Sequence, residues 1–87
     1  MEKKTKDRQN RAIMLHLSVW GSITSLDAIR MYDITRLSAR IWDIRHIYGW
    51  NIKTTAAQVE TKWGKTTVAR YELVGEANLM DYAEVTA

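Results

Sequence analysis

The chain has 87 residues, which suffice for one small domain but not for a large enclosed substrate cavity. It contains no cysteine, which excludes disulfides and thiolate metal sites and suits a reducing cytoplasm. Its apolar fraction of 46% is typical of a folded chain, its net charge is +3, and no apolar run predicts a transmembrane helix.

The charge is unevenly distributed along the chain. Residues 1–70 carry all 13 Lys and Arg against 6 acidic residues, a net charge of +7, whereas residues 71–87 carry 4 acidic residues and no basic one. A basic body followed by an acidic tail favours a polyanionic partner for the body. Basic surface charge also keeps proteins in solution that have no such partner, so the charge alone does not establish a polyanionic partner.

We expect three parts: a basic flexible arm over residues 1–6, a folded domain over 7–74, and an acidic tail over 75–87. The arm is charged and is not followed by the apolar segment of a signal peptide. Its lysines could contact phosphates or simply be solvated. In the tail, Asn78 could cap a short helix.

The first helix is predicted over residues 7–18. Ile13, Leu17 and Met14 form its inward apolar stripe, and Ala12 and Leu15 widen that stripe. His16 is a lone histidine on the flank of this helix, and we expect a surface side chain rather than a ligand or a base. Trp20-Gly21-Ser22 ends the helix, and Ile23-Thr24 can form a brief edge strand.

Two further helices are predicted over residues 25–32 and 35–48. Ser25 or Thr24 can cap the earlier helix, whose apolar side includes Ile29. Thr35 can cap the later one, and Gly49 can end it in a left-handed conformation.

The later helix has two chemically different faces. Its apolar face, expected to point inward, comprises Leu37, Ile41, Ile44, Ile47 and Tyr48. Its outer face comprises Ser38, Ala39, Trp42, Asp43 and His46, with Arg36 at the N-terminal edge. A short helix, a turn and a longer helix of this kind are typical of a helix-turn-helix, whose second helix enters the major groove of DNA. Two ordinary packed helices would show the same pattern.

A β-hairpin is predicted after Gly49. One strand runs from Trp50 to Val59, the turn from Glu60 to Lys65, and the second strand from Thr66 to Leu73. Ile52 is its best inward residue. Lys62 and Lys65 would lie at the tip, where a wing contacts phosphates. The order of elements therefore predicts an α+β fold, a winged helix-turn-helix with three helices and a hairpin wing.

The central part of the chain also resembles a known family. The run GSITSLDAIRMYDITRLSARIWDIRHIYGWNIKT is similar to the small winged helix-turn-helix domains of bacteriophages and prophages, and the similarity extends over residues 13–73. The matching positions are Gly21–Thr24, Asp27, Ala28, Ile34–Ile41, Asp43, Arg45, Gly49 and Ile52. Ile44 and Trp50 depart from the family pattern, which has leucine and tyrosine there, but both remain apolar. The acidic tail is not part of that pattern.

This resemblance implies a DNA-binding protein acting in the cytoplasm of a bacterial host, in phage gene regulation, excision or replication. The expected DNA-binding residues are Thr35, Arg36, Ser38, Ala39, Arg40, Trp42, Asp43, His46, Lys62, Trp63 and Lys65. Arg36 is the best candidate for a base contact, since arginine binds guanine bidentately, whereas Arg40 would meet a phosphate or an internal acid.

A second hypothesis is an inhibitor or adaptor that binds a host protein through the same helix pair. Trp42 keeps it open, because an exposed tryptophan is unusual in a base-reading helix and common at protein interfaces. Exposure of Trp42 beside Trp63 would favour a protein partner, and packing of Trp42 against the wing would favour DNA. The sequence leaves a homodimer open. No catalytic, phosphate-loop or metal-ligand pattern occurs, so we predict no enzyme activity and no cofactor.

Overall fold

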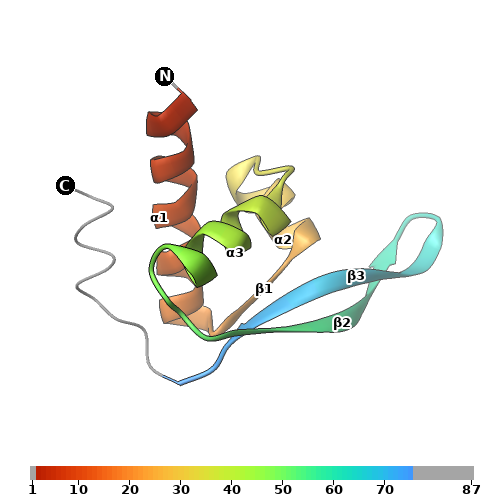
Figure 1. The fold of residues 1–87 in the computed structure, drawn as a ribbon. Helices are drawn as coiled ribbons and strands as arrows, with labels where there is room; N and C mark the ends of the chain where they lie inside the picture. The colour runs from red at the N-terminus through yellow and green to blue at the C-terminus, as the bar shows by residue number, and fades with distance from the viewer. Residues whose placement is uncertain (1, 76–87) are drawn as a thin grey trace.

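The computed structural model describes residues 2–75 as three helices and a three-stranded antiparallel sheet. The elements are α1 (Glu2–Trp20), β1 (Ser22–Thr24), α2 (Ser25–Tyr32), α3 (Leu37–His46), β2 (Ile52–Thr61) and β3 (Gly64–Leu73). The helices lie together beside the root of a long hairpin (Figure 1). The short helix expected after Asn78 lies outside the described residues.

Helix α1 is longer than the sequence pattern predicts. It begins at Glu2, so residues 2–6, expected as an arm, are helical. This stretch contains Lys and Glu, which favour helix, and neither Gly nor Pro. Ile13, Met14 and Leu17 are buried as expected. Leu15 is instead 47% exposed, because about 100° per residue places it opposite its neighbours two positions away.

Helix α2 has the predicted bounds and a complete N-terminal cap. The Thr24 hydroxyl accepts a hydrogen bond from the Asp27 backbone N–H at 3.1 Å, and the Asp27 carboxylate accepts one from the Thr24 N–H at 3.0 Å. Asp33 ends the helix in the left-handed region, at φ 56°. Ala28 is the buried residue of this helix, and Ile29, expected on its apolar side, is exposed.

Helix α3 buries the predicted stripe but has different ends. Arg36, not Thr35, occupies the N-cap position, and it makes no side-chain capping bond, so the predicted Thr35 cap is wrong. At the other end the Trp50 N–H donates to the Ile44 carbonyl at 3.2 Å, and Gly49 has φ 72°. This bond closes the end of the helix around Gly49, whose positive φ confirms the left-handed conformation predicted for it.

Leu37, Ile41 and Ile44 are buried on the inner side of α3, and Tyr48 packs against the same core. Ile47, predicted to join them, is 63% exposed. At about 100° per residue it lies at the edge of the stripe, about 80° from Leu37.

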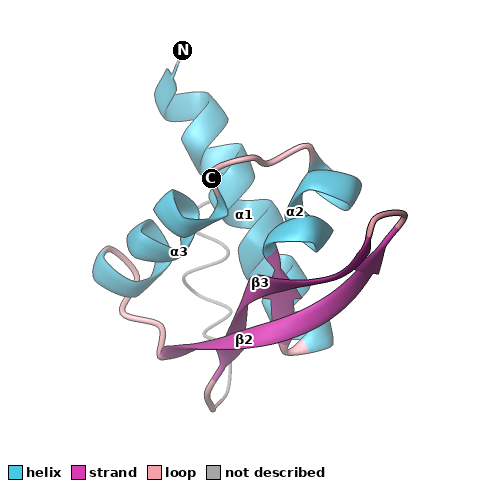
Figure 2. Ribbon diagram, turned by 90° about the vertical axis from the view of Figure 1, so that its right-hand side faces the viewer, coloured by secondary structure: helices cyan, strands magenta, loops and turns pink. Residues whose placement is uncertain are grey.

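The sheet has the order β1-β3-β2, and its hairpin turn is shorter than predicted. Thr61 is paired with Gly64, so the turn contains only Lys62 and Trp63. β1, the predicted edge strand, pairs with β3 only over residues 70–72. The rest of the hairpin extends beyond the helices as a two-stranded arm (Figures 1 and 2). At its root, Ile52 and Tyr71 are buried in the core.

His16 is buried, contrary to the expected surface position. Its Nδ1 lies 2.7 Å from the Tyr32 hydroxyl, and the two rings meet edge to face with centroids 5.6 Å apart. Burial lowers the pKa of His16 below its ordinary 6.5, against the opposing effects of the Asp27 carboxylate and the Ser22 backbone. Burial also raises the pKa of the Tyr32 hydroxyl. The protonated hydroxyl and the neutral imidazole thus share one hydrogen bond inside the domain.

We expect this buried imidazole to make the fold sensitive to acid. Because the folded-state pKa is depressed, the unfolded chain binds a proton more readily than the folded chain as the pH falls below about 6.5. The free energy of unfolding should therefore be highest above this pH and decline below it. His16→Gln keeps a side chain that can accept a hydrogen bond but does not titrate. Urea unfolding of both proteins from pH 8 to pH 5 should show a steeper decline for the wild type, and parallel curves would contradict the assignment.

Candidate nucleic-acid interface

The outer surface of α3 and the turn before it present a row of accessible side chains. Thr35, Arg36, Ser38, Trp42 and His46 are exposed, and Ala39 is half-buried. They share this surface because the opposite side of the helix is fixed in the core by Leu37, Ile41 and Ile44. The small Ser38 and Ala39 allow close approach of a partner near the N-terminal end. This is the face that the sequence predicts for DNA.

Trp42 and His46 form a flat stacked pair on that surface. Their ring centroids lie 4.3 Å apart at an interplanar angle of 16°, and His46 Nδ1 lies 2.9 Å from the Trp42 carbonyl oxygen. A carbonyl oxygen can only accept, so His46 Nδ1 carries a proton and donates it. The indole remains 56% exposed. Stacking thus fixes the orientation of both rings and leaves polar and aromatic surface for a partner.

Arg40 and Asp43 do not belong to this surface, although the sequence analysis includes them among the DNA-binding residues. Arg40 Nη2 and Asn10 Nδ2 lie 3.3 and 3.2 Å from the same Asp43 carboxylate oxygen. Arg40 and Asn10 are buried, so the group joins α1 to α3 inside the domain. The internal acid that the sequence analysis offers as one partner of Arg40 is therefore Asp43. Asn10 was missed, because a polar residue on a predicted helix gives no signal of a partner 33 residues away.

Arg45 fixes the hairpin to α3, a role that the sequence analysis did not assign. Its Nε and Nη2 both donate to the Ile52 carbonyl, at 3.0 and 2.6 Å, and Nη2 also donates to the Thr54 hydroxyl at 2.7 Å. Two of these bonds converge on one backbone oxygen, as the planar guanidinium fork permits. The start of β2 is consequently held at a defined place relative to the outer surface of α3.

The hairpin tip carries the second group of predicted site residues. Lys62, Trp63 and Lys65 are all exposed, and the Lys62 Nζ lies 5.7 Å from the centroid of the Trp63 ring. Along residues 54–69 the only other charged side chain is Glu60, which is paired across the strands with Lys65. The arm is thus nearly neutral along its length and cationic at its end, as expected for a wing that approaches phosphates.

The accessible side chains of α3 and those of the hairpin tip lie apart in space. In both ribbon views the tip points away from α3 (Figures 1 and 2). Trp42 takes neither position considered from the sequence: within the described residues, its ring contact is with His46. A partner that touches both groups must therefore span the distance between α3 and the tip.

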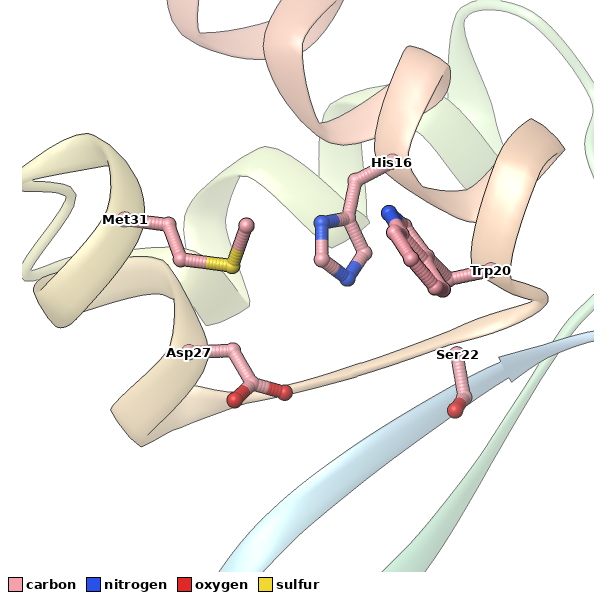
Figure 3. Close-up of a pocket in the computed structure, with 5 residues that line it drawn as sticks. All are labelled: His16, Trp20, Ser22, Asp27 and Met31. Atoms are coloured by element: carbon pink, nitrogen blue, oxygen red, sulfur yellow. The ribbon is translucent and has the colours of Figure 1, made fainter.

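One hollow lies away from both groups, between the end of α1, β1 and α2. His16, Trp20, Ser22, Asp27 and Met31 line it (Figure 3). Its polar groups are engaged within the fold: His16 with Tyr32, and Asp27 in the cap of α2. Within residues 2–75, no cluster of three acidic, His or Cys side chains could hold a metal ion, and no helix is long and apolar enough to cross a membrane.

Comparison with known proteins identifies one family. A family model described as a winged helix-turn-helix domain matches residues 8–76, which span all six described elements but for the first turns of α1. No curated protein and no solved structure matches the chain. Together with the three helices and the hairpin, the match confirms the predicted α+β winged helix-turn-helix fold.

We expect Arg40 and Arg36 to differ in their effect on stability, although both lie near the start of α3. Arg40→Ala would leave the Asp43 carboxylate without its buried cation, which costs about 3 kcal/mol of unfolding free energy. Arg36→Ala removes an exposed side chain and should change that free energy by about 0.5 kcal/mol or less. Urea unfolding measures both. Equal effects would show that Arg40 is not the internal partner of Asp43.

Proposed function

The chain belongs to the winged helix-turn-helix domain family, and from this membership we propose that it binds double-stranded DNA. In this proposal α3 enters the major groove and the hairpin wing contacts the sugar-phosphate backbone. The observation that carries it is the accessible outer surface of α3, which presents Arg36 and Ser38 at the N-terminal end, where such a helix reads base edges.

The charge of the described surface supports a polyanionic partner. Arg36, Lys62 and Lys65 are exposed on the two proposed contact regions, and none of them forms an ion pair with another described residue. Arg8 and Arg11 are also exposed, on α1, and add to the positive charge of the domain. Each phosphate contact made by such a side chain releases counterions, which favours binding at low salt.

A more specific proposal concerns the biological role of the protein and the cell in which it acts. The motif shared with phage and prophage domains, from Gly21 to Ile52, supports a role in phage gene regulation, excision or replication in the cytoplasm of a bacterial host. We propose that the protein acts there by binding and without catalysis. This proposal is supported by the family fold, because its proposed contact surfaces, the outer surface of α3 and the hairpin tip, are those of a DNA-binding module.

A host protein is the alternative partner, and one observation favours it. Trp42 leaves more than half of its indole accessible in the middle of the proposed recognition helix. Tryptophan is enriched among the residues that dominate binding energy at protein interfaces. In this alternative the stacked Trp42–His46 surface would bind a protein instead of a DNA groove.

A salt titration on duplex DNA separates these proposals. With about 4–6 phosphates bound by Lys and Arg, log K should fall against log salt with a slope of roughly −4 to −5. Fluorescence anisotropy of a labelled duplex, measured from low salt to about 200 mM, gives this slope. Absence of any complex at the lowest salt would reject DNA binding and leave the protein partner.

Arg36 and Lys65 should contribute in different ways. Arg36→Ala removes a side chain that can reach a base edge, so it should weaken binding by about 1–3 kcal/mol and relax preference at one position. Lys65→Ala removes a point charge at the tip, so it should weaken all sequences alike and reduce the salt slope by about one unit. Binding to a selected site and to its scrambled sequence measures both. An equal loss on both DNAs for Arg36→Ala would make Arg36 a phosphate contact only.

A further inference from the structure

Trp63 is exposed to an extent that the fold does not require. Its side chain is 89% accessible, more than that of Trp20 or Trp42, whereas Trp50 is buried in the core. A residue so exposed contributes little to the packing of the domain. Its position at the extreme end of the hairpin therefore calls for a partner that covers the indole.

The turn holds the backbone of Trp63 in a defined place. The Thr61 hydroxyl accepts a hydrogen bond from the Trp63 N–H at 3.1 Å and donates one to the Gly64 carbonyl at 2.8 Å. Gly64 has φ 110°, a conformation that L side chains rarely adopt. Thr61 and Gly64 are also paired across the strands. The two-residue turn is thus fixed from both sides, which lowers the entropy lost when Trp63 binds.

The neighbouring charges restrict the chemistry of the partner. Lys62 lies directly before Trp63 and Lys65 two residues after it, and both ammonium groups are exposed. An aromatic ring between two cations suits a partner in which flat apolar surfaces alternate with negative charges. DNA has this arrangement, with bases between phosphates, and stacking of bases on aromatic side chains is a recurrent mode of recognition.

Intact duplex hides the faces of its bases, so the indole can stack only where base stacking is interrupted or can be opened. Apolar side chains at the tips of DNA-binding elements do insert between base steps and kink the duplex. The arm is long, and apart from Lys62 and Lys65 its one charged side chain over residues 54–69 is Glu60, which is paired across the strands with Lys65, so the arm can bring Trp63 to such a step.

We propose that Trp63 stacks on a DNA base at a step where stacking is interrupted, while Lys62 and Lys65 bind the flanking phosphates. This inference rests on the proposed DNA binding and adds a preference for distorted duplex. Trp63 is then a specificity-determining residue for DNA structure, and α3 remains the reader of sequence.

The test compares two duplexes that differ only by one extra, unpaired nucleotide, which forms a bulge in one of them. Wild type should bind the bulged duplex more tightly. Trp63→Ala should lose about 5- to 100-fold in affinity for the bulged duplex and much less for the intact one, because one stacked base is lost. Trp63→Phe should retain most of the preference. Trp20→Ala, which removes another exposed indole, on α1, should leave both affinities unchanged.

Thermal melting of each variant checks that the domain stays folded. Trp63→Ala could instead lose the same affinity for both DNAs, or none for either. Both results would overturn the stacking role and leave the proposed duplex binding intact. Unchanged affinity for both DNAs would point to a protein contact for the indole. No binding of wild type to either duplex would reject the proposed function, and this inference with it.

Discussion

The structure depends on the burial of one side of α3 against α1 and the root of the sheet. Leu37, Ile41 and Ile44 are almost completely inaccessible, and the Asp43 carboxylate adds polar contacts to Asn10 and Arg40. Once this side is fixed, the opposite side of α3 must face outward. Arg45 then holds the start of β2 through the Ile52 carbonyl, so the same helix also sets where the hairpin leaves the domain. The core thereby positions both proposed contact regions.

Periodicity and turn chemistry predicted much of this arrangement. The bounds of α2, the inward side of α3 and the hairpin follow from local patterns, because apolar spacing reports which side of an element is buried. The contacts that the sequence did not predict at Asn10 and His16 are set by distant parts of the chain. Arg40, expected to meet a phosphate or an internal acid, is buried beside Asp43, which also binds the distant Asn10, and His16, expected at the surface, is buried against Tyr32. The Thr35 cap failed for a local reason, since capping requires a backbone conformation that residue type does not fix.

The two proposed contact regions, the outer surface of α3 and the wing tip, differ in chemistry, and this difference suggests that they have different roles in binding. The surface of α3 presents mixed polar and aromatic groups in fixed orientation, including the stacked Trp42 and His46. Such groups suit discrimination among base edges or protein surfaces. The wing tip presents two lysines around an indole, with Glu60 paired across the strands with Lys65. It suits contact with the phosphates and bases of any sequence, so sequence preference would arise mainly in α3 and affinity for DNA shape in the wing.

The central claim is that the outer surface of α3 and the wing tip face one DNA molecule together. Amide chemical-shift mapping by NMR during titration with a short duplex tests it most directly. We predict that the largest changes fall on residues 35–46 and 61–65, with small changes at Leu15 and Val19 on the exposed side of α1. Changes concentrated on α1, with α3 and the tip unaffected, would contradict the claim.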